Sequence, residues 1–586
     1  MKIYTKLIVF ALTLFMFNAC TQDYIDSITK VEAGTDESAP QITVNFPPDG
    51  YELQTNEAVT SIDIDFKVTD DIEIKSISLK VDGSEINNYS EFKDYRVAME
   101  KYTYDNVTTG SHVLTVEATD TDGKTSTTNV NFTKAPPYVP QYVGETFYMP
   151  FNNEYREMNS LTLATAVGMP GFTDGIQQGT AYHGAADSYL TFPGTSLQGE
   201  EFSATFWLKL PSTIDSPAGL LVMSPEDTDN PDAQNVRTSG FRLFYDNSGG
   251  LAQIKGNVGT GDGETWVDGG DAAKFDPATN NGWLHVAFTI SKTEATLYVN
   301  GQLIKQSATT GVDWTGCDLL SIMSGAPRFT GWGHMSCTGD MDELRLYNKA
   351  LSQAEIQTMM LKEESTFHMG FNGNYKDAVS GDVATVVGSP SYAYGDGVSG
   401  DAYQGAADSY LTFPTTGLQE SNEFSASCWL KLPSTIDAAA GILVMGPEDT
   451  ANPDAQNDRT SGFRFFYDDA GGLAYFKVNV GTGSGETWAD GGDAAKVDPA
   501  VNSGWIHLAM TISGTEVAYY INGQQVSTAA TTGIDWTGCD LFSIMSGAPR
   551  FTGWGHLSCT GEMDGLYLFN KALSADEVTL LANDSD

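Results

Sequence analysis

Hydrophobic and polar residues alternate with a period of two along much of the chain. Between residues 62 and 68, Ile62, Ile64, Phe66 and Val68 alternate with Asp63, Asp65 and Lys67, which is the pattern of a strand with one buried face. Residues 76–83 also read as a strand that ends in a turn, and residues 110–124 as a strand that leads into a hairpin. The pattern predicts a β-sandwich over residues 40–135, followed by a stiff proline-rich linker at 136–145.

A duplication dominates the rest of the chain. Residues 146–362 and 363–586 carry the same motifs at an offset of 220 to 222 positions, and residues 313–344 match residues 535–566 at 28 of 32 positions. A unit of this length is a whole domain, because solenoid repeats have only about 20 to 50 residues. The sequence therefore predicts an all-β protein made of one small sandwich and two larger, related domains.

The first residues have the pattern of a targeting segment. Lys2 and Lys6 flank the start of an apolar run from Leu7 to Phe17. A run of about 11 residues is too short to cross a bilayer but suits the core of a signal peptide, so residues 1–19 are expected to be removed. Residues 20–39 are polar and are predicted to form a flexible tether. No later run approaches 18 apolar residues, so we expect no transmembrane helix.

Net charge excludes one class of function. The chain has 31 Lys and Arg residues against 76 Asp and Glu residues, which gives a formal net charge of −45. This charge repels phosphate backbones, so no nucleic acid is expected as a partner. Hydrophobic residues at 41% and aromatic residues at 11% are too many for a disordered acidic chain.

The end of the predicted signal peptide, Phe17-Asn18-Ala19-Cys20, resembles the lipobox of bacterial lipoproteins. The resemblance implies a lipid on Cys20 that anchors the protein in the outer membrane. Asp23 and Asp26 resemble the acidic export signals of Bacteroidota surface lipoproteins, which implies a place on the cell surface. An ordinary secretory peptide with a chance cysteine is the alternative.

Four sequence blocks occur in the same order in both copies, at 202–210, 283–289, 297–301 and 341–352 and again at 424–432, 505–511, 519–523 and 563–574. They resemble the laminin-G-like, concanavalin A-like lectin/glucanase jelly roll, which implies two tandem jelly-roll sandwiches. The strand and hairpin at 110–124 resemble a bacterial immunoglobulin-like (Ig-like) domain, a module that mostly acts as a spacer. Ser352 as N-cap and Glu355 three residues later predict a short helix over 352–361.

The tryptophans divide into two groups. Trp207, Trp429, Trp283 and Trp505 lie in apolar alternating strands and are predicted to be core residues. Trp266 and Trp488 lie in segments rich in glycine and aspartate, and Trp332 and Trp554 lie in the motif Arg-Phe-Thr-Gly-Trp-Gly-His. These last four are the candidates for stacking on sugar rings.

Arginine and histidine of the same motif are candidates for hydrogen bonds with sugar hydroxyls, namely Arg328 and His334 in the first copy and Arg550 and His556 in the second. The arginines would also favour an acidic sugar. A structural role inside the loop is the alternative for these residues, because strong identity between two copies also follows from a recent duplication.

Cysteines recur in pairs that are 20 residues apart. Cys317 with Cys337, and Cys539 with Cys559, flank the motif symmetrically, so each pair is predicted to form a disulfide across a long hairpin. Cys428 replaces Phe206 and is predicted to be a buried free thiol. No cysteine or histidine spacing is typical of a zinc site.

Calcium is the metal that the jelly-roll resemblance implies, since laminin-G-like domains often carry one calcium ion at the rim of the sandwich. The resemblance assigns Asp342 and Asp564 as ligands, because they match the aspartate of the family's last block. Asn152, Asn372 and Asp377 lie in the first-strand region that is expected beside them.

Binding fits the sequence better than catalysis. The Glu-X-Asp-X-X-Glu pattern of glucanases with this fold is absent from both copies, and two linked weak sites raise avidity. We expect a non-enzymatic surface lipoprotein that captures a polysaccharide or oligosaccharide for a SusC/SusD-like outer-membrane importer. The alternative is an accessory subunit of such an importer that makes protein contacts or handles peptides, and adhesion to host matrix is a third hypothesis.

Overall fold

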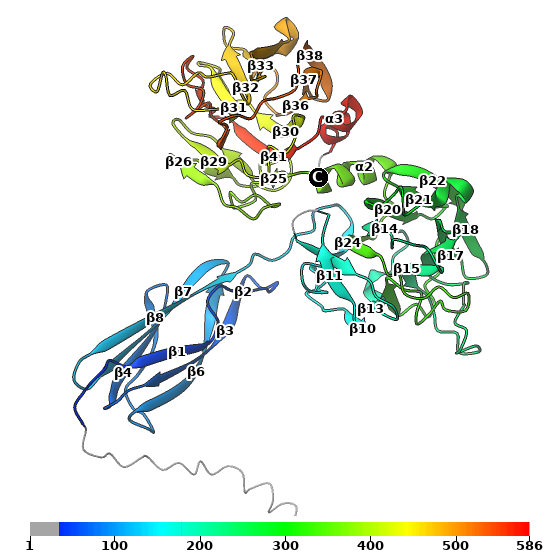
Figure 1. The fold of residues 1–586 in the computed structure, drawn as a ribbon, viewed down its shortest axis with the longest axis horizontal. Coiled ribbons are helices and arrows are strands. Elements are labelled where there is room, and N and C mark those ends of the chain that lie inside the picture. Colours follow the sequence, from blue (N-terminus) through cyan, green and yellow to red (C-terminus); the bar gives the residue numbers. More distant parts are fainter. Residues whose placement is uncertain (1–33, 177–178, 585–586) are drawn as a thin grey trace, which may run out of the picture. The chain divides into compact units, whose positions relative to one another are not determined.

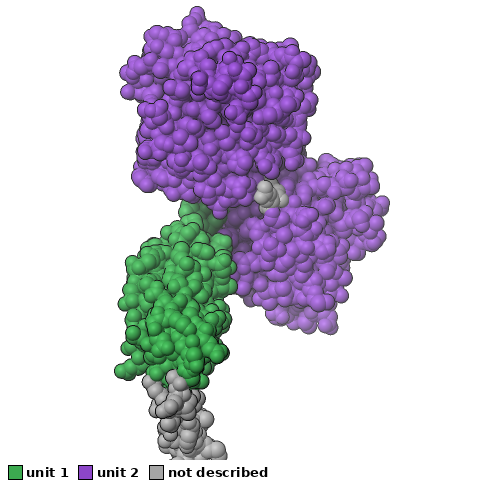
Figure 2. Space-filling view, turned by 60° about the vertical axis from the view of Figure 1, so that its left-hand side comes forward, with its two compact units in different colours: residues 1–139, 159–161 green, residues 140–158, 162–586 purple. Residues whose placement is uncertain are grey.

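The computed structural model describes residues 34–176 and 179–584 and shows an all-β chain (Figure 1). Two compact units are distinguished, residues 34–139 with 159–161 and residues 140–158 with the rest of the chain (Figure 2). The predicted signal peptide, Cys20 and most of the predicted tether lie outside the described residues. Within the described part of the chain, no helix is long and apolar enough to cross a membrane.

The first unit is a sandwich of two sheets, in the strand orders β1-β3-β6 and β2-β8-β7-β4-β5. Its core confirms the alternation seen in the sequence, because Ile62, Ile64, Phe66 and Val68 of β3 are all buried between the sheets. The strands are β1 (Gln41–Phe46), β2 (Tyr51–Leu53), β3 (Val59–Thr69), β4 (Ile74–Val81), β5 (Ser84–Tyr89), β6 (Val97–Thr108), β7 (Gly110–Asp120) and β8 (Thr125–Lys134).

The first jelly roll packs two sheets face to face, in the orders β10-β13-β23-β15-β16-β17-β18 and β11-β12-β24-β14-β20-β21-β22, with β9 paired to β24 and β19 to β17. Its elements are β9 (Glu145–Met149), β10 (Thr165–Val167), β11 (Gly171–Asp174), β12 (Thr180–His183), β13 (Tyr189–Pro193), η1 (Thr195–Leu197), β14 (Phe202–Lys209), β15 (Ala218–Met223), β16 (Phe241–Asn247), β17 (Ala252–Gly259), β18 (Glu264–Asp268), η2 (Gly270–Ala273), β19 (Lys274–Phe275), β20 (Trp283–Ile290), β21 (Glu294–Val299), β22 (Gln302–Ala308), β23 (Leu319–Ile322), β24 (Asp340–Tyr347) and α2 (Gln353–Glu363).

The second jelly roll repeats this topology, in the orders β26-β29-β39-β31-β32-β33-β34 and β27-β28-β41-β30-β36-β37-β38, with β25 paired to β41, β35 to β33 and β40 to β31. Its elements are β25 (Phe367–Met369), β26 (Thr385–Val387), β27 (Ser391–Ala393), β28 (Ala402–Gln404), β29 (Tyr410–Pro414), β30 (Phe424–Lys431), β31 (Ala440–Met445), β32 (Phe463–Asp469), β33 (Ala474–Gly481), β34 (Glu486–Asp490), η3 (Gly492–Ala495), β35 (Lys496–Val497), β36 (Trp505–Ile512), β37 (Glu516–Ile521), β38 (Gln524–Ala530), β39 (Leu541–Ile544), β40 (Leu557–Ser558), β41 (Glu562–Phe569) and α3 (Ala575–Ala582).

The predicted terminal helix is confirmed in α2. Ser352 is its N-cap, and both hydrogen bonds of the capping box with Glu355 are present. The helix packs on the outer face of its sheet, where Ile356 and Met359 join Ala287, Tyr298 and Tyr347 in a small apolar cluster. Ser574 and Glu577 cap α3 in the same way.

The prediction of core positions for four tryptophans needs correction. Strand alternation places Phe206 and Leu208 of β14 between the sheets and Trp207 on the opposite face, where its indole N–H donates to Glu363 of α2 at 2.8 Å. Trp207 is thus buried, but by the helix. The other three tryptophans are only half-buried. Trp429 lies on the outer face of β30, as Trp207 does on β14, and Trp283 and Trp505 are the first residues of β20 and β36.

The two predicted disulfides are wrong, since Cys317, Cys337, Cys539 and Cys559 are free and buried. Cys317 precedes β23, whereas the backbone N–H of Cys337 donates to the carbonyl of Met323, just after β23 ends. A strand of four residues spans about 13 Å, while the Cα atoms of a disulfide lie about 4.4 to 6.8 Å apart. The same arrangement separates Cys539 from Cys559 across β39. Cys428 is buried, as predicted.

Candidate functional site

Each jelly roll carries an aromatic cluster on the outer face of one sheet. In the first copy Leu221 and Leu243 point into the core, and Val222 and Phe244, their neighbours in β15 and β16, therefore point outward. Phe329 covers these two residues, and Trp266 of the edge strand β18 packs against them. Val444, Phe466, Phe551 and Trp488 form the same cluster in the second copy.

Two predicted stacking residues come together in each cluster. Trp332 lies beside Trp266, with ring centroids 5.9 Å apart and ring planes inclined by 14°. Trp554 and Trp488 lie 5.9 Å apart and are inclined by 20°. Trp332 is 46% exposed and Trp554 is 50% exposed, which is unusual for so large an apolar side chain. The two exposed indoles are therefore the available contact surfaces of the clusters.

An arginine that sequence reasoning missed completes each cluster. The guanidinium carbon of Arg237 lies 4.3 Å from the Trp332 ring centroid, and its Nε donates to Glu264 Oε2 at 2.7 Å. Arg459 lies 4.3 Å from Trp554 and donates to Glu486 at 2.6 Å. We call these two sets, Trp266, Trp332, Arg237 and Glu264 and then Trp488, Trp554, Arg459 and Glu486, the tryptophan–arginine clusters. The recurrence of Arg-Thr-Ser-Gly before β16 and β32 was the available sequence signal.

Arg459 and Trp488 do not enclose Trp554 between them. In the second copy Arg459 lies 4.3 Å from Trp554 and 6.0 Å from Trp488, and the two indoles are 5.9 Å apart. With these three distances Arg459 and Trp488 cannot lie on opposite faces of Trp554. The cation and the second indole thus leave the other face of Trp554 uncovered by either of them.

His334 and His556 do not occupy the ligand-contacting position predicted for them. Both are 2% exposed. The ring of His334 stacks on Phe329 at 4.7 Å, and its Nε2 lies 2.9 Å from Asp246 Oδ1. His556 repeats these contacts with Phe551 and Asp468. Burial beneath the loop makes both histidines supports for the loop that presents Trp332 or Trp554.

Arg328 and Arg550 are also engaged within the protein. Arg328 lies between Glu226 at 3.2 Å and Asp318 at 3.0 Å, and its side chain is only 14% exposed. Arg550 makes the same two ion pairs with Glu448 and Asp540. These contacts favour the structural alternative for both arginines, and Arg237 and Arg459 take the place beside the exposed indole.

Asp342 and Asp564, the predicted calcium ligands, are buried on the outer face of the other sheet. Burial raises the pKa of Asp342 to about 8 and that of Asp564 to about 6. Asp564 Oδ2 accepts a hydrogen bond from the Ser399 N–H at 3.0 Å, and Asn372 Oδ1 accepts one from the Asp401 N–H at 2.7 Å. Asp377, in contrast, is saturated by the N–H groups of its own turn and of the strand before it.

The donor set around Asp564 fits a hard cation. A Cβ at Gly397 would lie 2.8 Å from Asp564 Oδ2 and 2.7 Å from the Asp401 carbonyl, and a Cβ at Gly400 would lie 2.2 Å from Asn372 Oδ1. Glycine at these two positions thus leaves room for the three oxygens, and oxygens are the ligands that calcium prefers. No group of three His, Cys, Asp or Glu side chains with metal-site geometry occurs among the described residues, so amide and backbone oxygens would complete such a site.

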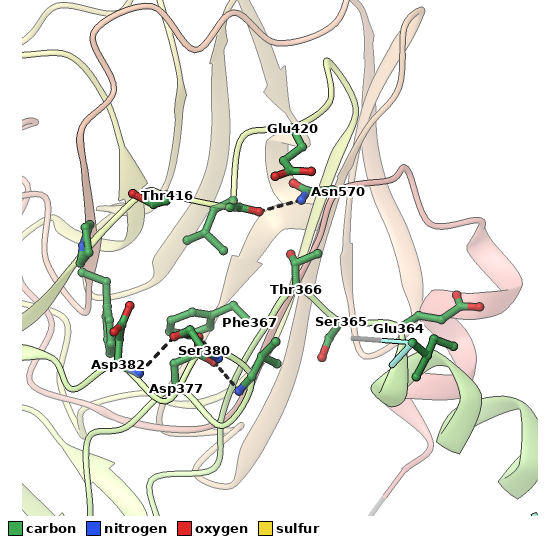
Figure 3. Close-up of a pocket in the computed structure, with 16 residues that line it drawn as sticks. Glu364, Ser365, Thr366, Phe367, Asp377, Ser380, Asp382, Thr416, Glu420 and Asn570 are labelled. Carbon is green, nitrogen blue, oxygen red and sulfur yellow. Dashed lines mark hydrogen bonds between the residues drawn. The ribbon is translucent and has the colours of Figure 1, made fainter. Parts of the chain in front are cut away.

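A pocket of about 380 Å³ lies elsewhere in the second jelly roll (Figure 3). Its polar groups mostly serve the fold: Ser380 donates to the Asp377 carboxylate at 2.6 Å, and Asn570 donates to the Gly417 carbonyl at 2.9 Å. Neither Trp488 nor Trp554 lines this pocket. It is therefore distinct from the tryptophan–arginine cluster.

Several solved structures are similar to this chain. Domain 4 of AbnA, an extracellular GH43 arabinanase from Geobacillus stearothermophilus in complex with arabinotriose, is 18% identical over 36% of this chain and 96% of its own, with a TM-score of 0.28. Domains LG4-5 of the mouse laminin alpha1 chain are 13% identical over 70% and 96%, with a TM-score of 0.22. CBM40 of the Ruminococcus gnavus IT-sialidase, bound to α2,3-sialyllactose, is 16% identical over 28% and 83%, with a TM-score of 0.22.

Comparison by sequence supports the jelly-roll assignment directly. No curated protein matches the chain. The family model of the concanavalin A-like lectin/glucanases superfamily matches residues 183–357 and 404–579, which together make up more than half of the chain. Both matches fall within the two jelly rolls and include the tryptophan–arginine clusters. The chain therefore belongs to the concanavalin A-like lectin/glucanases superfamily.

Proposed function

We propose that the protein binds glycans through the tryptophan–arginine cluster of each jelly roll. One observation carries the proposal: a half-exposed tryptophan with an arginine 4.3 Å from its ring recurs in both copies on the same face of the fold. An open indole face suits the C–H face of a sugar ring, and charged and amide side chains around it suit the hydroxyls at the ring's edge.

The arrangement prepares the indole for binding. Arg237 lies over the Trp332 ring, Trp266 stacks beside it, and Phe329 and His334 also contact it. A side chain that is already held loses little conformational freedom when a ligand binds. We therefore assign Trp332 and Trp554 to stacking, and Arg237, Glu264, Arg459 and Glu486 to hydrogen bonds with hydroxyls.

Binding without catalysis agrees with the pKa values of the two carboxyls beside Trp266. Glu264 and Asp268 flank Trp266 on β18. Burial works to raise the pKa of both carboxyls, but hydrogen bonds and the charges of Arg237 and Lys255 outweigh it, so that both pKa values are lowered. A glycoside hydrolase needs a general acid with a raised pKa, and neither carboxyl has that property.

Calcium is part of the proposal. Asp564, Asn372 and the Asp401 carbonyl would hold the ion in the second copy, and Asp342 with Asn152 would do so in the first. A bound cation would tie the first-strand loop to the last strand. Its chemistry there would be structural, because the tryptophan–arginine cluster lies on the outer face of the other sheet.

We place this binding protein on the cell surface, anchored in the outer membrane by a lipid on Cys20. The first unit is proposed to be an Ig-like spacer, in keeping with its two-sheet sandwich and its hairpin motif. The captured polysaccharide or oligosaccharide would pass to a SusC/SusD-like importer. These assignments rest on the sequence resemblances described above.

The test uses the protein without residues 1–20, a glycan array and affinity electrophoresis in polysaccharide gels. Trp332→Ala/Trp554→Ala is compared with the parent protein, in calcium and in chelator. Loss of one stacking contact of about 1 kcal/mol weakens each site roughly fivefold, so the double variant should lose retardation in the gel. Trp283→Ala/Trp505→Ala is the matched control.

Two results would contradict glycan binding at the clusters, and a third would contradict the calcium assignment. A folded parent protein that binds no glycan would favour the alternative of an accessory subunit that contacts importer proteins or peptides. Equal loss of binding in the control variant would show that the sugar sits elsewhere. If chelator leaves both binding and thermal stability unchanged, the calcium assignment is wrong.

A further inference from the structure

We propose that the tryptophan–arginine clusters select uncharged glycans and reject glycans that carry carboxylate or sulfate groups. This inference rests on the proposed glycan-binding function and names the ligand class of the same sites. It replaces the expectation that an arginine in this region favours an acidic sugar.

The arginine of each cluster already holds a carboxylate with two of its nitrogens. Arg237 directs Nε to Glu264 Oε2 at 2.7 Å and Nη2 to Oε1 at 3.4 Å. Arg459 holds Glu486 in the same two-point manner, at 2.6 and 3.2 Å, and its Nη1 donates to the Asn457 carbonyl at 3.4 Å. A carboxylate or sulfate binds arginine through two parallel N–H groups. The glutamate occupies the Nε–Nη2 pair, so an anionic ligand would have only the outer Nη1–Nη2 pair of an arginine whose charge the glutamate already balances.

The neighbouring cations are held between pairs of carboxylates. Lys255 lies 3.0 Å from both Asp246 and Asp268, and Arg328 lies between Glu226 and Asp318. Lys477 and Arg550 are held in the same way in the second copy. The arginines, lysines and carboxylates of each site thus comprise three cations and five carboxylates, which sum to two negative charges.

This charge distribution disfavours an anionic ligand at two ranges. Close to the site, a negatively charged ligand would meet two carboxylates in excess of the cations, and like charges repel. At longer range, the net charge of −45 repels it during approach. An uncharged sugar has neither cost. Its hydroxyls are donors, and the carboxylates of the site accept hydrogen bonds.

The experiment compares matched polysaccharides that differ in charge. Affinity electrophoresis at low salt uses dextran against dextran sulfate, hydroxyethylcellulose against carboxymethylcellulose, and highly methyl-esterified pectin against polygalacturonate. We expect the parent protein to bind at least one uncharged member of a pair at least tenfold more tightly than its anionic partner. High salt should narrow that difference, because salt screens the repulsion.

The double variant Glu264→Gln/Glu486→Gln tests whether the tryptophan–arginine clusters cause the preference for uncharged glycans. The change releases each arginine from its carboxylate and reduces the net charge of each site from two negative to one negative, so the variant should gain binding to the anionic partner by tenfold or more. The control variant Glu294→Gln/Glu516→Gln also removes two negative charges, but at the start of β21 and β37 in the other sheet. This variant should not gain binding to the anionic polysaccharide.

The outcomes separate this inference from the proposed function. Binding to no polysaccharide by a folded protein overturns both. Tighter binding of the anionic partner by the parent protein overturns the inference and leaves glycan binding intact. An equal gain in the control variant shows that net charge, and not the cluster, sets the preference. If the Gln variant does not fold, the preference of the parent protein and its salt dependence decide the inference.

Discussion

His285 shows how strongly burial in the fold can change the pKa of one side chain. It lies on β20 and is 1% exposed, and its ring meets Trp207 edge to face at 5.1 Å. Neither ring nitrogen has a hydrogen-bond partner among the described residues. Burial lowers the pKa of His285 from 6.5 to about 3, so the folded protein keeps this histidine neutral.

This shift makes stability depend on pH. An unfolded chain protonates the histidine below about pH 6.5, whereas the folded chain does so only near pH 3. The stability that the protein keeps because His285 is neutral is therefore complete above pH 6.5, and it is lost as the pH falls from 6.5 toward 3. His285→Phe removes the proton site and keeps an aromatic ring. Its free energy of unfolding, relative to the parent protein, should rise by about 2 kcal/mol between pH 7 and pH 5.

Urea unfolding at the two pH values measures this difference. The comparison at pH 7 corrects for any change in packing, since His285 is neutral there in both states of the chain. A parent protein and variant that lose the same stability between pH 7 and pH 5 would show that this histidine is not buried in the way described.

At the scale of elements, β23 and β39 explain why a regular cysteine spacing misled the prediction. The spacing of 20 suggested a hairpin closed by a disulfide. A hairpin-like loop does exist, but an isolated bridge between Ser324 and Ser336 closes it, and a whole strand separates the two cysteines. β23 and β39 form because they pair with strands from elsewhere in the chain. The spacing between two cysteines contains no information about such pairing.

We therefore expect five free thiols in the protein without residues 1–20, even after purification in air. Alkylation in denaturant without reductant, followed by mass spectrometry, should label Cys317, Cys337, Cys428, Cys539 and Cys559 completely. Prior reduction should change neither the labelling nor the thermal midpoint. A peptide that links Cys317 to Cys337, or Cys539 to Cys559, would contradict the arrangement around β23 and β39.

At the scale of the whole molecule, the two jelly rolls are more alike at the tryptophan–arginine clusters than around Asp342 and Asp564. Both tryptophan–arginine clusters keep every residue type and nearly the same distances. Next to the predicted metal ligands, in contrast, Glu343 becomes Gly565 and Arg345 becomes Tyr567. In the first copy Arg345 pairs with Glu145, Glu343 and Glu363, and this network has no equivalent set of residue types in the second.

Two equal clusters predict avidity. For a short oligosaccharide, Trp332→Ala and Trp554→Ala should each weaken one of the two sites roughly fivefold and leave the affinity of the other site unchanged. For a long polysaccharide that spans both sites, either single change should weaken the overall binding by about the same fivefold, because both contacts contribute to one association. Isothermal titration calorimetry with both ligands checks this. A long polysaccharide whose tightest binding is unchanged by either single change would mean that the two clusters act separately.

Much of the fold and part of the site were determined by the sequence alone. Period-two alternation identified the buried face of β3, the repeat identified two equal domains, and the Ser352 capping box identified the start of α2, because each depends on residues close together in the chain. Trp266 and Trp332 were recognised from their glycine-rich surroundings. Only the tertiary structure decided that they meet across 66 positions, that Arg237 joins them by pairing with Glu264 across 27, and that His334 is buried. The physical reason is that strand order in the sheet brings these residues together, and strand order is set by the packing of the whole domain rather than by any local pattern.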